Sequence, residues 1–394
     1  MIGVLLGTIT GLTPGLHVNT VLAIVLPLGA VLLDHLAVRD VVAFIVSMSV
    51  THTFVDFIPA VLVGAPKEDS VLSVLPGHRL LRQGRGYEAV RLTVLGGVGS
   101  VAVAITALPM AVVLLPVIYS SIKTVLPYIL LGVLGYMVVT ERTPLKMFYA
   151  AVIIAYSGIL GVVILGHSSF SGSDALFPTL TGLFGVSTLL LSARGGDTIP
   201  NQSLRYEPGM HPSGILAGSI GGMLTGLLPG VGSSQSALMV HNLLGKKGEK
   251  NFLVAMGGVN TSDGIYALLA LYLISNPRSG ASIAVERLMG ELTRGDFLFM
   301  VATVMLTTFF AAYITLALGR ILVKRVQRIS YRPFSASILV FLVVLVYILT
   351  GYMGLLILIT ATGIGLIAPL TGVKRTHSMA VLIIPTILYY LSLL

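Results

Sequence analysis

The chain has 394 residues, of which 55% are apolar and only 10% charged, and its mean hydropathy is +0.97. A soluble domain carries about a quarter charged residues, so these values exclude a soluble enzyme, a disordered chain and a secreted disulfide scaffold. The chain contains no cysteine, which excludes disulfides and thiolate chemistry. The composition predicts an all-α polytopic membrane protein. The net charge of +9 therefore informs on orientation through its distribution among loops, and we expect no nucleic-acid partner.

Apolar runs close to the ~20 residues that a membrane-spanning helix needs recur along the whole chain. They cover residues 41–63, 92–118, 125–139, 148–165, 176–192, 252–275, 297–319, 335–350, 354–370 and 378–394. The polar stretch 193–213 contains Gly, Pro, Asn and Asp residues, which cannot support a spanning helix. We therefore predict a first membrane repeat at 1–192, a linker at 193–213 and a second membrane repeat at 214–394.

Short motifs recur in the two halves in the same order. The matches are Gly7-x-x-x-Gly11-x-x-Pro14-Gly15 with Gly222-x-x-x-Gly226-x-x-Pro229-Gly230, Val50-Thr51-His52 with Val259-Asn260-Thr261, Arg85-Gly86 with Arg294-Gly295, and Leu180-Thr181-Gly182 with Leu370-Thr371-Gly372. The first match has an offset of 215 and the second an offset of 209. Glycine and leucine are common enough to align by chance, but ordered anchors favour an internal duplication. Each copy is predicted to comprise a re-entrant Pro-Gly helical hairpin and about five transmembrane helices.

The basic residues predict the orientation in the membrane. If residues 1–33 and 214–244 are re-entrant, one face receives loops that carry 19 of the 24 basic residues, and the other face receives 5. The basic-rich loops are 66–91, 140–147, 193–213, 245–251, 320–333 and 371–377. The positive-inside rule places these loops in the cytoplasm. Corresponding loops of the two halves then lie on opposite faces, which is the pattern of inverted repeats in secondary transporters.

Each half begins with a Pro-Gly break followed by polar residues. Proline suits the first turn of a helix, and glycine permits a tight bend. A helix that restarts after each break would direct its partly positive N-terminal amides toward the centre of the protein, where two such ends form an anion site. The predicted site residues are Pro14, Gly15, His17, Asn19, Thr20, Pro229, Gly230, Ser233, Ser234 and Gln235. In the alternative interpretation, Pro and Gly merely kink two helices, and Ser and Thr bond to their own backbone.

Ionisable residues inside apolar runs are a second signal, because each is costly in hydrocarbon and usually faces a cavity. His52 and Asp56 are four residues apart and share one helical face. The corresponding run of the second half contains Asn260, Thr261 and Asp263. A carboxylate near an amide and hydroxyls suits Na⁺, whereas a His–Asp pair suits a proton. A static polar contact that holds two helices together is the structural alternative.

An amphipathic stretch follows each of these runs. Lys67 and Arg79 are candidate contacts for an anion on the cytoplasmic side. The alternative is an interfacial helix whose basic residues contact lipid headgroups.

Several catalytic motifs are missing from the sequence. It has no Walker A motif, no His-Glu-x-x-His, no Gly-x-Ser-x-Gly and no Cys/His metal cluster. A primary pump and an enzyme of these classes are therefore not expected. We expect no cofactor beyond a coupling Na⁺ or H⁺.

The paired Gly7–Gly15 and Gly222–Gly230 motifs resemble the TctA-like family, the large membrane subunit of tripartite tricarboxylate transporters. The similarity runs nearly end to end through Asp56-Phe57-Ile58-Pro59, Gly64-Ala65-Pro66 and Leu75-Pro76-Gly77-His78. The resemblance implies the fold and a carboxylate-type anion such as citrate. It also implies a small membrane subunit and an extracytoplasmic binding protein as partners.

The chain departs from the bacterial pattern of that family by its short length and by His17 and Asn19, where small residues are more usual. Such compact versions resemble the archaeal branch, in which accessory subunits are often not evident. Separately, Pro229-Gly-Val-Gly-Ser-Ser-Gln235 is similar to a repeat of polyprenyl-phosphate transporters. A phosphate headgroup would use the same helix ends as a carboxylate.

The sequence thus predicts a multi-pass protein of a prokaryotic cell membrane, in contact with membrane lipids, that transports an organic anion by alternating access. A lipid-phosphate transporter is the first alternative, and a non-transporting membrane scaffold or enzyme is the second. The sequence leaves open whether the chain forms a homo-oligomer.

Overall fold

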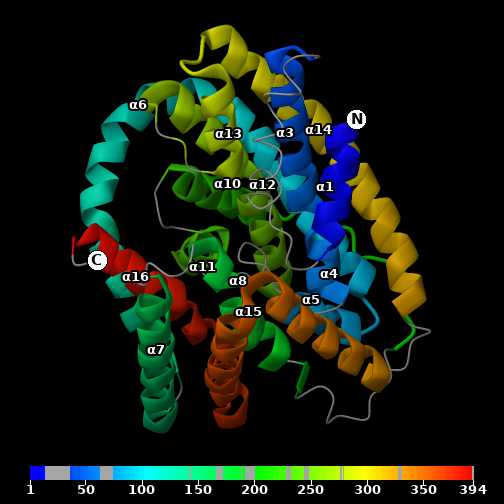
Figure 1. Ribbon diagram of the computed structural model, residues 1–394, viewed down its shortest axis with the longest axis vertical. Coiled ribbons are helices and arrows are strands. Elements are labelled where there is room, and N and C mark those ends of the chain that lie inside the picture. The colour runs from blue at the N-terminus through cyan, green and yellow to red at the C-terminus, as the bar shows by residue number, and fades with distance from the viewer. Residues whose placement is uncertain are drawn as a thin grey trace.

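The computed structural model describes residues 1–13, 36–62, 74–141, 143–165, 172–187, 189–190, 200–227, 232–243, 248–275, 277, 279–326 and 331–392. These residues form helices joined by turns and one extended segment at 200–211 (Figure 1). The helices are α1 (Ile2–Leu12), α3 (Val38–Val55), α4 (Phe57–Leu62), α5 (Val74–Arg82), α6 (Gly86–Val139), α7 (Pro144–Leu165), α8 (Gly172–Leu180), the π-helix η2 (Thr181–Val186), α10 (Pro212–Leu227), α11 (Ser233–Leu243), α12 (Gly248–Ile274), α13 (Gly280–Met289), α14 (Arg294–Val326), α15 (Tyr331–Thr371), the 3-10 helix η3 (Arg375–Met379) and α16 (Ala380–Tyr390).

Among the described residues, six helical segments are long and apolar enough to cross a membrane. They differ in how much of their apolar window is buried inside the protein. The share is 83% for α12 and 72% for α3 with α4, but only 33% for α7 and 22% for α15. The two helices that carry the predicted ionisable residues are therefore the inner ones, and the outer helices present apolar surface to the surroundings. Figure 1 shows α12 in the middle of the molecule and α7 and the last part of α15 extending from it.

The structure modifies two predicted boundaries and agrees with a third. Residues 119–124, predicted as a loop, lie inside the continuous helix α6, because their Ser, Ile, Lys and Thr residues lack the Gly or Pro that would break it. The predicted loop at 351–353 is confirmed, since Gly351 adopts a φ of 64° that interrupts α15. The predicted span at 378–394 is wrong over its described part: α16 has 11 residues, about 16 Å of helix.

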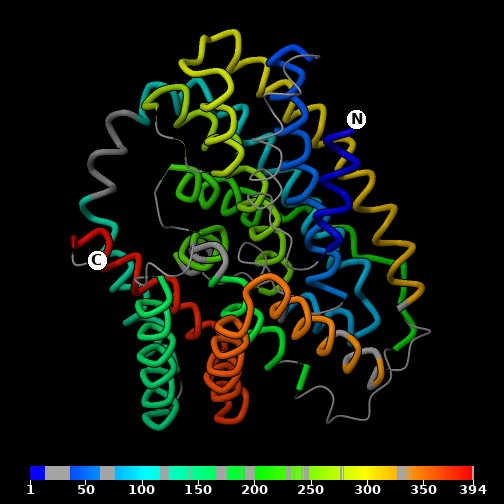
Figure 2. Tube along the Cα trace, in the orientation of Figure 1, coloured from blue at the N-terminus to red at the C-terminus, as the bar shows by residue number. Residues whose placement is uncertain are grey.

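The inner helix α3 runs parallel to α14 of the second half. Arg39, near the start of α3, pairs with Asp296, near the start of α14, across 2.9 Å. Further along both helices, Thr307 Oγ1 donates a hydrogen bond to Ser47 Oγ across 3.2 Å. In the trace of Figure 2, these two helices lie side by side with α1.

The inner helix α12 runs parallel to α6 of the first half. Lys250, near the start of α12, pairs with Glu88, near the start of α6, across 3.0 Å. Further on, the backbone of Gly257 packs against the backbone of Thr93. Because α3 leads through α4 and α5 to the start of α6, the two inner helices α3 and α12 run in opposite directions.

Glycines of α1 pack against α3 at three successive turns. A Cβ atom at Gly3 would meet Ser47, one at Gly7 would meet Thr51, and one at Gly11 would meet Val55. Small residues of this kind let two helix backbones approach closely. The spacing thus places α1 directly on α3.

Glycines of α10 pack against α12 in the same way. A Cβ atom at Gly218 would meet Gly258, one at Gly222 would meet Ser262, and one at Gly226 would meet Tyr266. These contacts relate α12 to α3 by an offset of 211. In this packing His52 takes the same place as Asp263, whereas the predicted offset of 209 pairs His52 with Thr261.

The fourth predicted match, Leu180-Thr181-Gly182 with Leu370-Thr371-Gly372, is not supported by the structure. Gly182 lies in η2, where a Cβ atom would meet Leu358 and Ala361 of α15. Gly372 instead ends α15 with a φ of +67°. The two glycines have different surroundings, because short Leu-Thr-Gly matches in an apolar chain carry little information on register.

Contacts between loops agree with the predicted grouping of loops by charge. Loops 66–91, 193–213 and 245–251 meet where Arg85 pairs with Glu207 and Glu207 with Lys250. Loops 140–147 and 371–377 meet where His377 and Lys374 contact Glu141. The basic-poor loops 34–40 and 276–296 meet at Arg39 and Asp296.

Because α12 approaches α6 closely, replacing glycine by alanine should destabilise the protein at one position of α12 and not at another. Gly257→Ala should lower the free energy of unfolding by about 1–3 kcal/mol, because the new Cβ overlaps the backbone of Thr93. Gly264→Ala should have no cost, because a Cβ there meets open space and alanine favours the helix by up to ~1 kcal/mol. The apparent melting temperatures of the purified variants test this, and equal temperatures would contradict it.

Candidate functional site

Asp56 lies at the junction of α3 and α4 and is only 2% exposed. The amide nitrogen of Asn260 on α12 donates to both carboxylate oxygens of Asp56, each across 3.4 Å, and to the carbonyl oxygen of Thr53 across 3.1 Å. Pro59 in α4 has no N–H to donate to the carbonyl of Val55. Carboxylate and carbonyl oxygens therefore gather at this junction, and such oxygens are ligands for hard cations.

His52 lies one helical turn before Asp56. It is buried, and its Nδ1 atom lies 2.9 Å from the hydroxyl of Thr10 on α1. The hydroxyl of Thr10 also donates to the carbonyl oxygen of Gly7 across 3.2 Å. The hydroxyl of Thr10 thus bridges the ring of His52 and the backbone of α1.

In the second half, the helix restarts after the Pro-Gly break as predicted. α10 ends at Leu227 and α11 begins at Ser233. Ser233 and Ser234 are buried in the first turn of α11, and Ser233 Oγ donates to a carboxylate oxygen of Asp263 across 3.4 Å. The carboxylate of Asp263 therefore lies beside the partly positive N-terminus of α11.

Helix α12 connects the two acidic positions. Asn260 and Asp263 are three residues apart and lie on one face of the helix. That face contacts Asp56 of the first half at one turn and Ser233 of α11 at the next. Within the described part of the chain, no group of three or more His, Asp or Glu side chains converges to hold a metal ion.

Other predicted residues have different positions. Thr261 donates to the carbonyl oxygen of Gly257 in its own helix. Arg79 on the amphipathic helix α5 pairs with Glu249 at the start of α12. Of Gln235, only its place in the backbone of α11 is described. The remaining predicted site residues lie outside the described residues: Pro14, Gly15, His17, Asn19, Thr20, Lys67, Pro229 and Gly230.

Two threonines that contact these groups were missed by the sequence prediction. Thr10 and Thr225 occupy the same place in the two copies of the Pro-Gly motif, which both read Gly-x-x-Thr-Gly-Leu-x-Pro-Gly. Thr10 contacts His52, and Thr225 contacts the hydroxyl of Ser236 on α11 across 2.8 Å. The threonine shared by the two copies of the motif was the signal that could have predicted these residues. The sequence prediction considered only the Gly and Pro residues of the motif.

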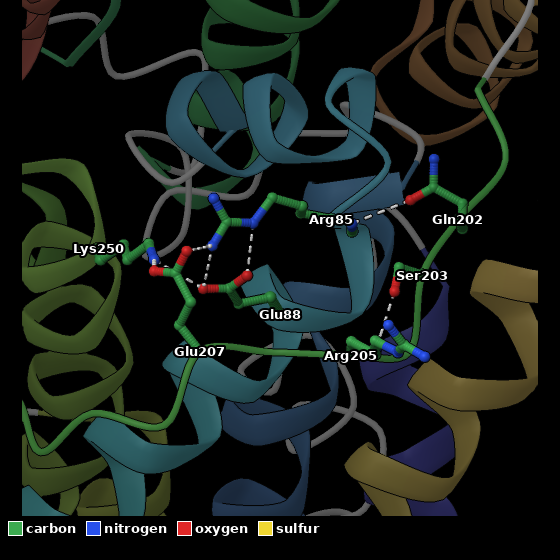
Figure 3. Close-up of polar contacts among 8 residues, drawn as sticks. Arg85, Glu88, Gln202, Ser203, Arg205, Glu207 and Lys250 are labelled. Carbon is green, nitrogen blue, oxygen red and sulfur yellow. Dashed lines mark hydrogen bonds and ion pairs between the residues drawn. The ribbon is translucent and has the colours of Figure 1, made fainter.

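A cluster of four charged residues, Arg85, Glu88, Glu207 and Lys250, joins the starts of α6 and α12 (Figure 3). Arg85 donates to both carboxylate oxygens of Glu88, across 2.7 and 2.9 Å, and also pairs with Glu207 across 3.1 Å. Lys250 pairs with both glutamates. Its hydrogen bond to the carboxylate of Glu207 and the charge of Arg85 hold the pKa of Glu207 below its usual value.

Glu207 belongs to the linker, whose extended segment lies across the turn between α5 and α6. The backbone N–H of Ser203 donates to the carbonyl oxygen of Gly84 across 2.8 Å. The side chain of Gln202 donates to the carbonyl oxygen of Leu81 and accepts from the backbone N–H of Gly86. Figure 3 shows this segment running past the charged cluster, so the linker between the two halves is fixed to one end of the molecule.

Comparison with known proteins identifies relatives over nearly the whole chain. The model of the tripartite tricarboxylate transporter TctA family matches residues 1–380. An uncharacterized protein of Methanocaldococcus jannaschii is 29% identical, and the alignment covers 99% of this chain and 98% of the relative. No solved structure matches.

Removal of a basic residue should reduce the stability of the protein by different amounts at the start of α12 and at the start of α3. Lys250→Met should lower the free energy of unfolding by about 1–3 kcal/mol, because it removes a partner of Glu88, which is 2% exposed. Arg39→Met should cost less than about 1 kcal/mol, because Arg39 is 60% exposed and Asp296 keeps its bonds to Thr293. Apparent melting temperatures measure the difference, and an equal or larger loss for Arg39→Met would contradict it.

Proposed function

Because the chain belongs to the tripartite tricarboxylate transporter TctA family, we propose that it is a secondary active transporter. It moves a carboxylate-type organic anion, such as a tricarboxylate, across the cell membrane by alternating access, and Na⁺ or H⁺ supplies the driving gradient. The Pro-Gly breaks with the helix ends that follow them bind the anion, and Asp56, Asp263 and His52 respond to the cation. The apolar outer surfaces of α7 and α15 contact membrane lipids.

The observation that carries this proposal is the position of Asp263 beside the N-terminus of α11. A helix N-terminus attracts anions, but a carboxylate at the same place repels a second anion. A bound cation neutralises the charge of Asp263 and so raises the affinity of the helix end for the anion. Cation and anion then bind together, which is the requirement for cotransport.

The proposal treats the two halves as inverted repeats. It is supported by the opposite directions of α3 and α12 and by the common packing of α1 on α3 and α10 on α12. It is also supported by two corresponding ion pairs. Arg39 with Asp296 and Lys250 with Glu88 each join the start of an inner helix to the start of a long helix from the other half.

In this mechanism, the two corresponding ion pairs lie at opposite ends of the molecule, with the Lys250 end in the cytoplasm. Each pair holds its end closed, and the pairs separate in alternation as one bundle of helices rocks against the other. The exposed position of Arg39 makes its pair weak enough to open.

The family description names a tripartite transporter, which suggests a small membrane subunit and an extracytoplasmic binding protein as further partners. Transport by the purified chain alone would place such subunits outside the transport step itself.

The proposal predicts that Asp263→Asn separates anion binding from cation coupling. In proteoliposomes, uptake of citrate driven by a Na⁺ or proton gradient should fall more than about tenfold, because the coupling charge is gone. Binding of citrate to the purified variant should persist without the dependence on cation that the wild type shows. Asp40→Asn, at an exposed position near the start of α3, is the matched control and should behave as the wild type.

Normal gradient-driven uptake by Asp263→Asn would refute the role of Asp263, and normal uptake by Ser234→Ala would refute the role of the α11 N-terminus. A wild type that binds a polyprenyl phosphate and not citrate would replace the carboxylate proposal with the lipid-phosphate one. A wild type that binds and transports neither would support a scaffold or an enzyme instead.

Alternating access predicts that a cross-link at either end blocks transport. The chain has no cysteine, so the pairs Arg39→Cys with Asp296→Cys and Glu88→Cys with Lys250→Cys can be joined by a short bifunctional thiol reagent. Each linked pair should lose at least about nine tenths of its uptake, because neither end can then open. The four single-cysteine variants treated with the same reagent are the controls. Undiminished uptake by a fully linked pair would contradict the mechanism.

A further inference from the structure

The last turns of α1 and α10 carry one threonine each at the same position of the duplicated motif. The hydroxyl of Thr10, which is 2% exposed, joins the backbone of α1 at Gly7 to the ring of His52 on α3. The hydroxyl of Thr225 joins the backbone of α10 at Gly221 to the hydroxyl of Ser236 on α11. Each threonine therefore connects the helix that precedes a Pro-Gly pair to a polar group on another helix.

Each of these polar groups lies one helical turn from a residue of the acidic site. His52 precedes Asp56 by four residues, and the two share a face of α3 and α4. Ser236 follows Ser233 by three residues, and Ser233 donates to Asp263. In each half, contacts thus lead from the helix before the Pro-Gly break through a threonine to the neighbourhood of a carboxylate, by way of α3 in the first half and α11 in the second.

Other threonines near the Pro-Gly break make different bonds. Thr8, two residues before Thr10, donates to the carbonyl oxygen of Val4 in its own helix across 2.8 Å. Thr13 likewise donates to the carbonyl oxygen of Ile9. Among the threonines of α1, Thr10 is the one whose hydroxyl contacts the side chain of a different helix within the described residues.

We propose that Thr10 and Thr225 are a pair of positioning residues that connect the helices preceding the two Pro-Gly pairs to the cation-responsive groups. The inference rests on the proposed function for the identity of those groups. Thr10 fixes the orientation of His52 relative to Asp56, and Thr225 fixes Ser236 and the first turn of α11 relative to Asp263. Binding of a cation to a carboxylate thereby affects the helix end that binds the anion.

The test compares removal of each hydroxyl with its retention on a smaller side chain. Thr10→Val and Thr225→Val keep the shape of the side chain and lose the hydroxyl, Thr10→Ser and Thr225→Ser keep the hydroxyl, and Thr8→Val is the matched control on α1. The readout that needs no substrate is the rise in apparent melting temperature of the purified protein along a Na⁺ titration and along a pH series. A cation that binds the folded protein raises this temperature.

We expect each valine variant to need about tenfold more cation for the half-maximal rise, as for the loss of one buried hydrogen bond. We also expect Thr10→Val to displace the pH profile, because the ring of His52 then loses its contact with the hydroxyl of Thr10. The serine variants and Thr8→Val should follow the wild type. Should Thr10→Val fail to fold, the half-buried Thr225 carries the same comparison.

Valine variants with the cation and pH dependence of the wild type would overturn the inference, as would an equal loss in Thr8→Val or the serine variants. A wild-type protein whose melting temperature responds to neither Na⁺ nor pH would overturn it as well. Citrate uptake by the wild type is measured in parallel. Failure of uptake with a normal cation response would count against the proposed function and leave the positioning pair intact.

Discussion

The structure depends on the cost of holding carboxylates on the two most buried of its candidate membrane-spanning helices. A charge in an apolar interior is expensive unless it is paired or hydrogen-bonded. The described contacts supply uncharged donors: the amide of Asn260 to Asp56 and the hydroxyl of Ser233, with the N-terminus of α11, to Asp263. These hydrogen bonds lower the cost of placing the two carboxylates among apolar helices.

Close packing of helices through glycine is what brings these donors into place. α1 lies on α3 and α10 on α12 through glycines four residues apart, which lets the backbones approach closely. The inner helices then pack on the long helices of the opposite half, α3 on α14 and α12 on α6. Each half therefore packs against the long helix of the other half. A displacement of one half relative to the other changes the surroundings of both carboxylates.

The sequence was sufficient for features with a local signal. The restart of the helix after Pro229-Gly230, the break at Gly351 and the shared face of His52 and Asp56 follow from Gly, Pro and helical spacing. The alignment offset between α3 and α12 was harder to predict. Valine recurs so often in apolar helices that a short match is found at an offset of 209 as easily as at 211. Only the contacts of the glycines distinguish the two offsets. The pair of Glu88 with Lys250 joins residues far apart in sequence, which no local pattern indicates.

The extended segment 200–211 adds polar contacts at one end of the inner helices. The pairs Arg39–Asp296 and Lys250–Glu88 each join the start of an inner helix to the start of a long helix. The linker adds Glu207, which contacts Lys250, and backbone hydrogen bonds at the turn between α5 and α6. Among the described residues, these contacts lie at the Lys250 end. Substitutions in the segment 200–211 can therefore change the stability of that end without altering the packing of the inner helices.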